Sequence, residues 1–392
     1  MRLSSFNPVF CALLGIGVAA ANSHSQVPER HLEADAEFPE GFSIVSGLRE
    51  MPDGRLMVAD AIGQFVAFID FGTGDMEIIG REGQGPAEYR IPDALYPLPG
   101  DSTLLVDLGN GRLTALGPNG EFGSTQPIAR QVGDQMVVLI PVGVDGQGRV
   151  YFQPPAMSGR RRMRGSGPEL PDSAAIARWD RRTDVIDTLG AVKIETMRVS
   201  TSGRSNSRNV QVRPVPMSPL DAWNVAPNGM VAVARSPEYY VEWIGDSETR
   251  RGHLVDYDPE RVGRSEKEAW VESNSRGGLS MMVTMNNGVR TMSFGRGSGS
   301  DRPDVSGYEW PETMPPFYVR QAVLVDLDGN AWVQRSVPAG SAQLYDVFGS
   351  AGELTERVVL PPGREIVGFG QDVAYAVYYD EFDLQWLERY RM

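Results

Sequence analysis

The stretch 52-PDGRLMVAD-60 joins a tight turn to a short apolar strand that ends in an acid, and a second apolar strand, 65-FVAFID-70, follows closely. The same phrase returns at 328-DGNAWVQR-335 with 343-QLYDVF-348, and about six copies lie along the chain. A repeat of this kind indicates stacked supersecondary units, and units of four short strands are the blades of a β-propeller. The sequence therefore predicts an all-β fold, a six-bladed β-propeller.

The spacing of the copies predicts where the chain carries insertions. Their turns lie near residues 53, 100, 147, 228, 328 and 371. A blade of four short strands needs about 40 to 50 residues, so the two longest gaps contain additional segments. We place one insertion at about 157–172, an arginine-rich loop, and the other at about 258–316, whose first half has a helix-compatible composition. We expect residues 29–392 to form a single propeller domain, with segment 29–37 closing the ring as the outer strand of blade six.

The first 23 residues have the features of a signal peptide. A positive end at Arg2 precedes an apolar run over residues 8–21, and small residues at 19–21 suit cleavage. The run is too short to span a membrane, so we expect no span in the mature protein and a secreted or periplasmic location. The one cysteine, Cys11, lies inside this run, so no thiol chemistry is expected after cleavage.

The composition excludes several classes of function. The chain carries 37 basic and 51 acidic residues, a formal net charge of −14, whereas nucleic-acid binding needs a basic surface. Three histidines give few ligands for zinc and few bases for a serine triad, and no G-x-S-x-G turn occurs. We therefore expect no nucleic-acid partner and no cofactor, and we leave open whether the protein is an enzyme, with binding favoured.

Candidate site residues come from aligning the copies at the end of their shared strand. If that strand is the innermost of each blade, the residues just beyond it line the mouth of the central channel. They are Asp60, Asp107, Pro154, Arg235, Arg335 and a position near Tyr378. The prediction is a mixed-charge mouth with no metal. Calcium stays open as an alternative through Asp60 and Asp107, although the two arginines at the same ring positions would repel a dication.

Two roles are open for this mouth. The aspartates can pair with the arginines, or cap neighbouring turns, and so hold the ring together. Alternatively, the arginines can bind an anionic ligand bidentately. We favour the structural role for Asp60 and Asp107. For Arg235 and Arg335 we favour an anion site, because two cations converging on one channel need a negative group between them.

The segment 83-GQGPAEY-89 is interpreted as a crossover between blades, with Tyr89 packed between sheets. It resembles the G-x-G-P-x-E-[FY] crossover of bacterial six-bladed propellers of the NHL and TolB-like kind, and 53-DGRLMVAD-60 is similar to the NHL repeat. The resemblance covers most of residues 40–392. It implies the propeller fold and a superfamily that includes binding modules, lactonases and lyases, so it does not choose a function.

Two functions therefore remain. The first is an exported, non-catalytic binding or scaffold propeller that acts through Arg235, Arg335, Asp60, Asp107 and Tyr378 on a small anionic ligand or a protein partner. The alternative is a propeller hydrolase such as a calcium-assisted lactonase.

Overall fold

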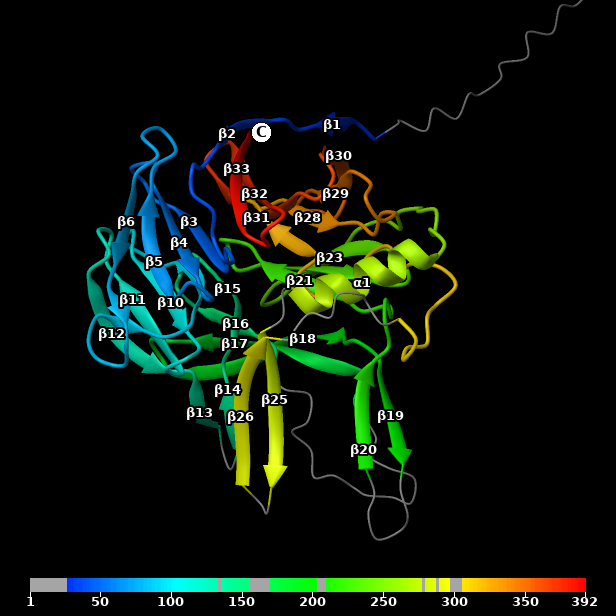
Figure 1. The fold of residues 1–392 in the computed structure, drawn as a ribbon, viewed down its shortest axis with the longest axis horizontal. Coiled ribbons are helices and arrows are strands. Elements are labelled where there is room, and N and C mark those ends of the chain that lie inside the picture. Colours follow the sequence, from blue (N-terminus) through cyan, green and yellow to red (C-terminus); the bar gives the residue numbers. More distant parts are fainter. Residues whose placement is uncertain are drawn as a thin grey trace, which may run out of the picture.

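The structure is a computed structural model that describes residues 27–132, 135–154, 170–202, 209–276, 279–286, 289–296 and 305–392. Six sheets of four or five strands follow one another along this part of the chain (Figure 1). The all-β class and the six-bladed propeller are therefore confirmed. The predicted signal peptide at residues 1–23 lies outside the described residues, as does most of the predicted loop at 157–172.

The blades have the following strands. Blade one holds β3 (Gly47–Glu50), β4 (Leu56–Asp60), β5 (Phe65–Ile69) and β6 (Met76–Ile79). Blade two holds β9 (Pro92–Pro97), β10 (Thr103–Asp107), β11 (Arg112–Leu116) and β12 (Phe122–Pro127). Blade three holds β15 (Pro141–Val144), β16 (Val150–Phe152), β17 (Ser173–Asp180) and β18 (Val185–Lys193).

The second half of the ring repeats this arrangement. Blade four holds β21 (Ala222–Val225), β22 (Val231–Arg235), β23 (Tyr240–Ile244) and β24 (Thr249–Arg251). Blade five holds β27 (Val323–Val325), β28 (Ala331–Gln334), β29 (Gln343–Phe348) and β30 (Leu354–Leu360), and blade six holds β31 (Glu365–Gly370), β32 (Val373–Tyr379) and β33 (Gln385–Arg391).

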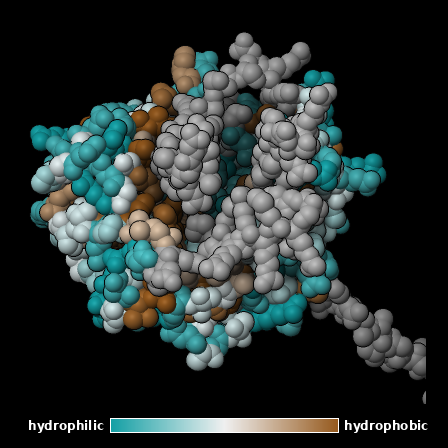
Figure 2. All heavy atoms as spheres, turned by 90° about the horizontal axis from the view of Figure 1, so that it is seen from below, coloured by the Kyte–Doolittle hydropathy of each residue, from teal (hydrophilic) through white to brown (hydrophobic). Residues whose placement is uncertain are grey.

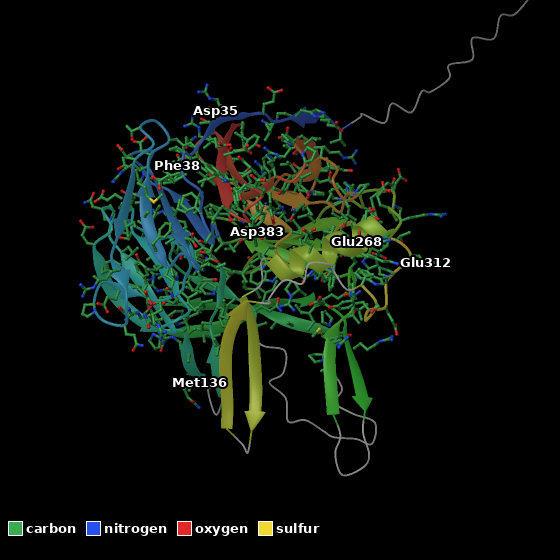
Figure 3. The ribbon with its side chains drawn as sticks, viewed as in Figure 1. Asp35, Phe38, Met136, Glu268, Glu312 and Asp383 are labelled. Carbon is green, nitrogen blue, oxygen red and sulfur yellow. The ribbon has the colours of Figure 1, made fainter. Side chains whose placement is uncertain are left out.

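The N-terminal segment closes the ring, as the sequence predicts. Strand β2 (Ala34–Glu37) pairs antiparallel with β33 and completes blade six, while β1 (Glu29–His31) adds to blade five in parallel with β30. Asp35 of β2 accepts hydrogen bonds from Arg389 Nε (3.0 Å) and Arg391 Nε (2.8 Å) on β33. Figures 1 and 3 show β1, β2 and Asp35 along the upper edge of the molecule. One segment therefore covers the edges of two blades.

The first strand of each blade faces the centre of the ring. Strand β3 contacts β9 and β31, β15 contacts β9 and β21, and β21 contacts β27. These strands approach closely: a Cβ atom on Gly47 would lie 2.6 Å from the backbone nitrogen of Leu95 in blade two. The second strands, which carry the repeated phrase, lie one place further out and are buried on both faces in blades one and two. The alternating burial expected of one-sided sheets is absent there because neighbouring blades cover both faces.

The crossover from blade one to blade two packs as predicted. Strands β7 (Arg81–Glu82) and β8 (Glu88–Tyr89) form a short parallel pair within it. Tyr89 is completely buried in the core cluster that joins these blades. Its hydroxyl donates to the carbonyl oxygen of Ile79 (2.7 Å) and accepts from the amide of Val66 (3.0 Å). Both polar capacities of the buried phenol are thereby satisfied.

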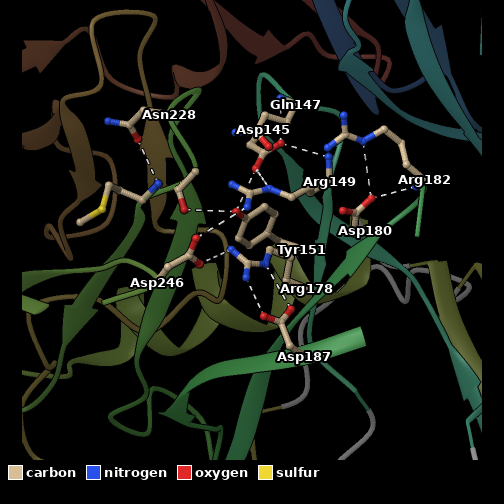
Figure 4. Close-up of polar contacts among 12 residues, drawn as sticks. Asp145, Gln147, Arg149, Tyr151, Arg178, Asp180, Arg182, Asp187, Asn228 and Asp246 are labelled. Atoms are coloured by element: carbon tan, nitrogen blue, oxygen red, sulfur yellow. Dashed lines mark hydrogen bonds and ion pairs between the residues drawn. The ribbon is translucent and has the colours of Figure 1, made fainter. Parts of the chain in front are cut away.

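A group of polar side chains lies at the border of blades three and four. In blade three, Asp145 accepts a hydrogen bond from the Tyr151 hydroxyl (3.0 Å). Nearby, Arg178 donates to Asp187 in the same blade (2.6 Å) and also to Asp246 in a turn of blade four (Figure 4). An arginine fork shared by two carboxylates fixes the relative orientation of these two sheets.

Three added hairpins lie in the crossovers between blades two and five, whereas the predicted insertion at 157–172 falls between β16 and β17 within blade three. Hairpins β13–β14 (Ala129–Val132, Gln135–Val138), β19–β20 (Met197–Ser202, Asn209–Pro214) and β25–β26 (Leu279–Asn286, Val289–Arg296) project on one side of the ring (Figure 1). Met136 marks the first of them in Figure 3. Seen from this side, hydrophilic residues and an apolar stripe both show at the surface of the described residues (Figure 2).

The one helix of the described residues, α1 (Arg264–Arg276), lies in the crossover from blade four to blade five. It confirms the helix expected in the first half of the 258–316 insertion. No helix among the described residues is long and apolar enough to cross a membrane.

Candidate functional site

The predicted mouth residues lie at or near the ends of second strands, which corrects the sequence-based alignment. The phrase strands β4, β10, β16, β22, β28 and β32 are second in their sheets, and the first strands are innermost. Asp60, Asp107, Arg235, Arg335 and Tyr378 therefore do not form one ring on the channel wall. Each has contacts within its own blade and the adjoining crossover, and the two arginines also contact the preceding blade.

Asp60 and Asp107 cap turns. The completely buried Asp60 accepts hydrogen bonds from the backbone amides of Gly63 (2.6 Å) and Ser43 (2.7 Å). Burial raises its pKa, although these amides oppose the rise. Asp107 accepts from the amide of Arg90 (3.1 Å) and from Asn110 Nδ2 (2.7 Å). Turn capping is one of the roles predicted for the aspartates. The predicted pairing with the arginines of blades four and five is wrong, since those arginines have other partners.

Arg235 pairs inside blade four. Its Nη1 donates to Asp221 Oδ2 (2.7 Å) and to the Ala191 carbonyl oxygen (2.9 Å), and its Nε donates to Glu242 Oε1 (2.9 Å). Burial lowers the pKa of Arg235, but the hydrogen bonds to Glu242 and Asp221 outweigh this and raise it. Two carboxylates thus neutralise one guanidinium, so no ligand anion is needed to balance it.

Arg335 pairs inside blade five. Its Nη1 donates to the completely buried Asp346 (2.6 Å), and its Nε donates to the carbonyl oxygen of Pro316 (3.3 Å). The guanidinium also lies 4.8 Å from the centre of the Tyr239 ring, within the range of a cation–π contact. The charge repulsion between Arg235 and Arg335 that the sequence suggested is therefore removed by protein carboxylates.

Tyr378 lies at the ring closure. Its hydroxyl donates to Glu37 on β2 (3.0 Å), and Arg364 stacks 4.4 Å from its ring centre. A ligand role for Tyr378 stays a prediction, and its contacts in the structure are those of blade six.

A cavity of about 360 Å³ lies beside Arg335, and we call it the α1 cavity. Its walls come from three places: α1, the segment Met314–Val319, and the loop of blade five from Gln334 to Gln343. The cavity combines a helix from the long insertion with a loop at the end of a blade strand. Loops held by a rigid scaffold commonly carry binding functions.

An apolar cluster seats α1 on the propeller. Trp270 of α1 is buried and packs with Met217 and Met314. Its ring lies 5.5 Å from that of Trp310, edge to face. A polar contact adds to this packing, because Glu266 accepts a hydrogen bond from the amide of Ala339 in the blade-five loop (3.3 Å). The helix is therefore anchored on both sides of the cavity.

Ser336 belongs to the wall of the α1 cavity, but its hydroxyl is buried beneath that wall. Its backbone amide donates to the Pro316 carbonyl oxygen (2.7 Å), while its Oγ is buried with no hydrogen-bond partner among the described residues. In blade four, Ser236 follows Arg235 as Ser336 follows Arg335, and its Oγ is likewise buried with no hydrogen-bond partner among the described residues. A buried hydroxyl without a hydrogen-bond partner costs about 1–3 kcal/mol of folding stability, so a natural structure that keeps one usually has a specific reason for it.

Two further titratable groups face the α1 cavity. Burial pushes the pKa of Glu266 upward, but backbone hydrogen bonds, including that from Ala339, outweigh it and leave the pKa below its usual value. Burial raises the pKa of Tyr318, and the nearby Glu266 charge adds to the rise. At neutral pH the cavity therefore contains an ionised carboxylate and a protonated phenol.

Sequence reasoning found Arg335 but missed Ser336, Glu266 and Tyr318. One signal was available: Arg235-Ser236 and Arg335-Ser336 follow the same strand in consecutive blades. The position of α1 beside the blade-five loop could not be predicted from the sequence, because it depends on packing between segments that are distant along the chain.

No group of three or more His, Cys, Asp or Glu side chains suited to a metal ion occurs in the part of the chain that the structure describes. The expectation that the protein lacks a cofactor stays a prediction.

Comparisons with known proteins find solved structures that are similar to the chain at low identity. No protein-family model and no curated protein matches the chain. Among solved structures, a DUF4221-family protein from Bacteroides vulgatus is 8% identical with a TM-score of 0.47, covering 92% of this chain and 97% of that one. A gluconolactonase from Xanthomonas campestris is 12% identical with a TM-score of 0.42, covering 92% and 93%. The calcium-binding regucalcin from Agrobacterium tumefaciens is 10% identical with a TM-score of 0.40, covering 93% and 96%.

These similarities are too low to transfer any activity, ligand or metal to this chain. The resemblance to NHL and TolB-like propellers likewise stays a prediction beyond the six-bladed fold that it implied.

Proposed function

We propose that the protein is an exported, non-catalytic binding propeller whose ligand occupies the α1 cavity. The observation that carries this proposal is the α1 cavity itself, a space of about 360 Å³ between α1 and the blade-five loop, whose wall includes the ionised Glu266.

The construction of the cavity supports the same proposal. One wall belongs to the blade-five loop, and another belongs to α1 in the crossover from blade four to blade five. Trp270 and Glu266 hold the helix over the cavity through packing and a hydrogen bond. A concave site with apolar walls and a few polar groups is the usual form of a small-molecule site.

A cavity-filling variant tests the proposal. Ala269 lies on α1 at the cavity wall, so Ala269→Trp places an indole in the space that a ligand would take. The matched control is Ala351→Trp in the exposed turn between β29 and β30, which is absent from the cavity wall. The two variants and the parent are screened by thermal shift against a small-molecule library. Ligands that stabilise the parent and Ala351→Trp but not Ala269→Trp support the proposal. Equal responses from all three proteins would contradict it.

The hydrolase alternative has its own measurement. Elemental analysis of the purified protein determines whether calcium is present in stoichiometric amount. Stoichiometric calcium would favour the calcium-assisted lactonase over the binding propeller.

A further inference from the structure

We infer that the α1 cavity binds an organic ammonium ion, whose positive charge lies against Glu266 and whose apolar part lies against the aliphatic side chains of the same wall. This ligand class rests on the proposed function and narrows it. Its charge is opposite to that of the anion which Arg235 and Arg335 suggested in the sequence.

The positive charge at the cavity wall is already neutralised inside the protein. Arg335 has only 9% of its side chain exposed, and its Nη1 donates to the completely buried Asp346 (2.6 Å). Its Nε donates to the carbonyl oxygen of Pro316 (3.3 Å). Arg357 on β30 also binds Asp346 but does not line the cavity. A ligand anion would have to compete with a desolvated protein carboxylate for Arg335, so Arg335 is not an open anion site.

The negative charge at the wall has no such counter-ion. Glu266 accepts hydrogen bonds from the amides of Gly263 (3.0 Å) and Ala339 (3.3 Å), which are uncharged donors. Burial raises the pKa of Glu266, but backbone hydrogen bonds outweigh the rise and keep the pKa below its usual value. No basic side chain of the described residues forms an ion pair with Glu266, whereas Glu268 on the same helix pairs with Arg264 (2.8 Å).

The balance of these two charges sets the sign of the ligand. Glu266 and Arg335 are the charged side chains among the described residues of the wall. Because Asp346 neutralises Arg335, the charge left at the wall is that of the Glu266 carboxylate. It attracts a cation and repels a carboxylate or a phosphate, and a part-buried charge acts more strongly than one in bulk water.

The uncharged polar groups of the wall also suit an ammonium head. Gln343 donates its amide hydrogens to the carbonyl oxygens of Arg335 (2.9 Å) and Leu344 (3.2 Å), which leaves its Oε1 as an acceptor. A carboxylate has about four acceptor positions, more than the two amides bound to Glu266 occupy. An ammonium group carries only donors, so acceptors on α1 and on blade five both match it.

The apolar part of the wall provides for the rest of the ligand. Val319, Val337 and Pro338 line the cavity, and Val319 is 38% exposed. Burial of apolar area is the main non-directional source of affinity, so an amine with an apolar substituent should bind better than ammonium alone. The volume of about 360 Å³ is near the lower end for small-molecule sites, so we expect a small ligand.

The test uses three probes that share one aromatic ring and differ in charge: benzylammonium, benzyl alcohol and benzoate. Their dissociation constants are measured by ligand-observed NMR titration against the mature chain at pH 7, where Glu266 is ionised. Four variants accompany the parent: Ala269→Trp, Ala351→Trp, Glu266→Gln and Glu268→Gln.

The two glutamate variants separate the charge from the fold. Glu266→Gln removes the charge but keeps a side chain that can accept from the amides of Gly263 and Ala339, and glutamine serves in this capping position as glutamate does. Glu268→Gln is the matched control, because it removes a negative charge from the same helix and Glu268 does not line the cavity. Thermal unfolding verifies that both variants remain folded.

We expect benzylammonium to bind most tightly and to be lost in Ala269→Trp but not in Ala351→Trp. Glu266→Gln should weaken benzylammonium about tenfold, the effect of one hydrogen bond to a charged group. The same change should leave the weaker binding of benzyl alcohol nearly unaltered. Glu268→Gln should leave benzylammonium nearly unaltered as well.

The results that would overturn the inference differ in what they leave standing. If benzyl alcohol or benzoate binds at least as tightly as benzylammonium and is lost in Ala269→Trp, the ligand is not a cation and the proposed function stands. The same holds if Glu266→Gln weakens benzylammonium no more than Glu268→Gln does. If no probe binds, or if Ala269→Trp changes nothing, the α1 cavity is not the binding site and the proposed function fails too.

Discussion

Asp346 of β29 is completely buried, and its Oδ2 lies 2.6 Å from Nη1 of Arg335, the residue that follows the neighbouring strand β28. The same carboxylate accepts hydrogen bonds from the Tyr239 hydroxyl (2.8 Å) and from Arg357 Nε (3.2 Å). Tyr239 belongs to blade four, so this one carboxylate ties two blades together. The ion pair accounts for Arg335 without a bound anion.

Arg335→Ala should therefore destabilise the protein. It removes one partner from a buried carboxylate and leaves the more exposed Arg357 to balance the charge. The expected loss is about 3 kcal/mol in the free energy of unfolding, measured by chemical denaturation. Arg320→Ala is the control, because its side chain is 59% exposed and its ion pair with Glu195 spans 3.5 Å. That change should cost less than about 1 kcal/mol. Equal, small effects in both variants would show that the Arg335 pair is not structural.

A second prediction concerns a turn aspartate of blade five. Asp326 accepts hydrogen bonds from the buried indole of Trp332 (2.9 Å) and from the amide of Asn330 (2.8 Å). Asp326→Ala leaves the indole N–H without its partner, and we expect a loss of about 2 kcal/mol in the free energy of unfolding. Asn228→Ala in the exposed turn of blade four removes one hydrogen bond, to the amide of Met230, and should cost less than about 1 kcal/mol. The same denaturation experiment compares the two, and a loss in Asp326→Ala no larger than in the control contradicts the prediction.

The aspartate–aromatic pair also shows why the blades were predictable. Asp145 with Tyr151, Asp326 with Trp332 and Asp380 with Trp386 are each six residues apart and hydrogen-bonded across a turn. The first two pairs span the equivalent turn of blades three and five, between the first and second strands, whereas Asp380–Trp386 spans the turn between β32 and β33. A local pair at an equivalent turn is specified by adjacent residues, so it appears in the sequence as a repeat.

The radial order of the strands was not predictable in the same way. Strand β4 is fully buried and strongly apolar, whereas the innermost β3 is only half buried and contains Arg49 and Glu50. The expectation that the repeated phrase forms the innermost strand is wrong, because a second strand is better covered by neighbouring blades and is the more apolar of the two. That error placed the five candidate residues on one channel wall. The partners of Arg235 and Arg335 depend on cross-strand register, and the α1 cavity depends on distant packing, so neither follows from local pattern.

A third prediction concerns the closure of the ring. Strands β1 and β2 cover the outer edges of β30 and β33, so a chain that begins at residue 38 exposes the backbone groups of both edges. Exposed strand edges pair with other chains. We expect this chain to unfold at a lower temperature than a chain that begins at residue 27, and to associate as its concentration rises. Calorimetry and light scattering measure the two effects. Identical behaviour of the two chains would show that the segment is dispensable.

The last prediction concerns Asp93, the extra residue at an irregularity of the innermost strand β9, between the pairs Pro92–Asp107 and Ala94–Val106. Burial raises its pKa from 3.8 to about 6, and the described residues provide no hydrogen-bond donor to its carboxylate. Because the pKa is higher in the folded than in the unfolded protein, the folded state binds the proton more tightly. The stability that Asp93 contributes is therefore fully present below pH 3.8 and is lost as the pH rises through about 6.

Asp93→Asn has nearly the same shape and no charge, so it should remove this pH dependence. At pH 8 we expect the variant to be more stable than the parent, by at most about 3 kcal/mol, because the parent then carries a poorly solvated carboxylate. Near pH 4, where the parent Asp93 is protonated when folded, the two proteins should unfold at nearly the same denaturant concentration. Denaturation at a series of pH values measures the difference. A difference that does not grow between pH 4 and pH 8, or a variant that is less stable at pH 8, would show that the Asp93 carboxylate is solvated or has a partner that favours its ionised form.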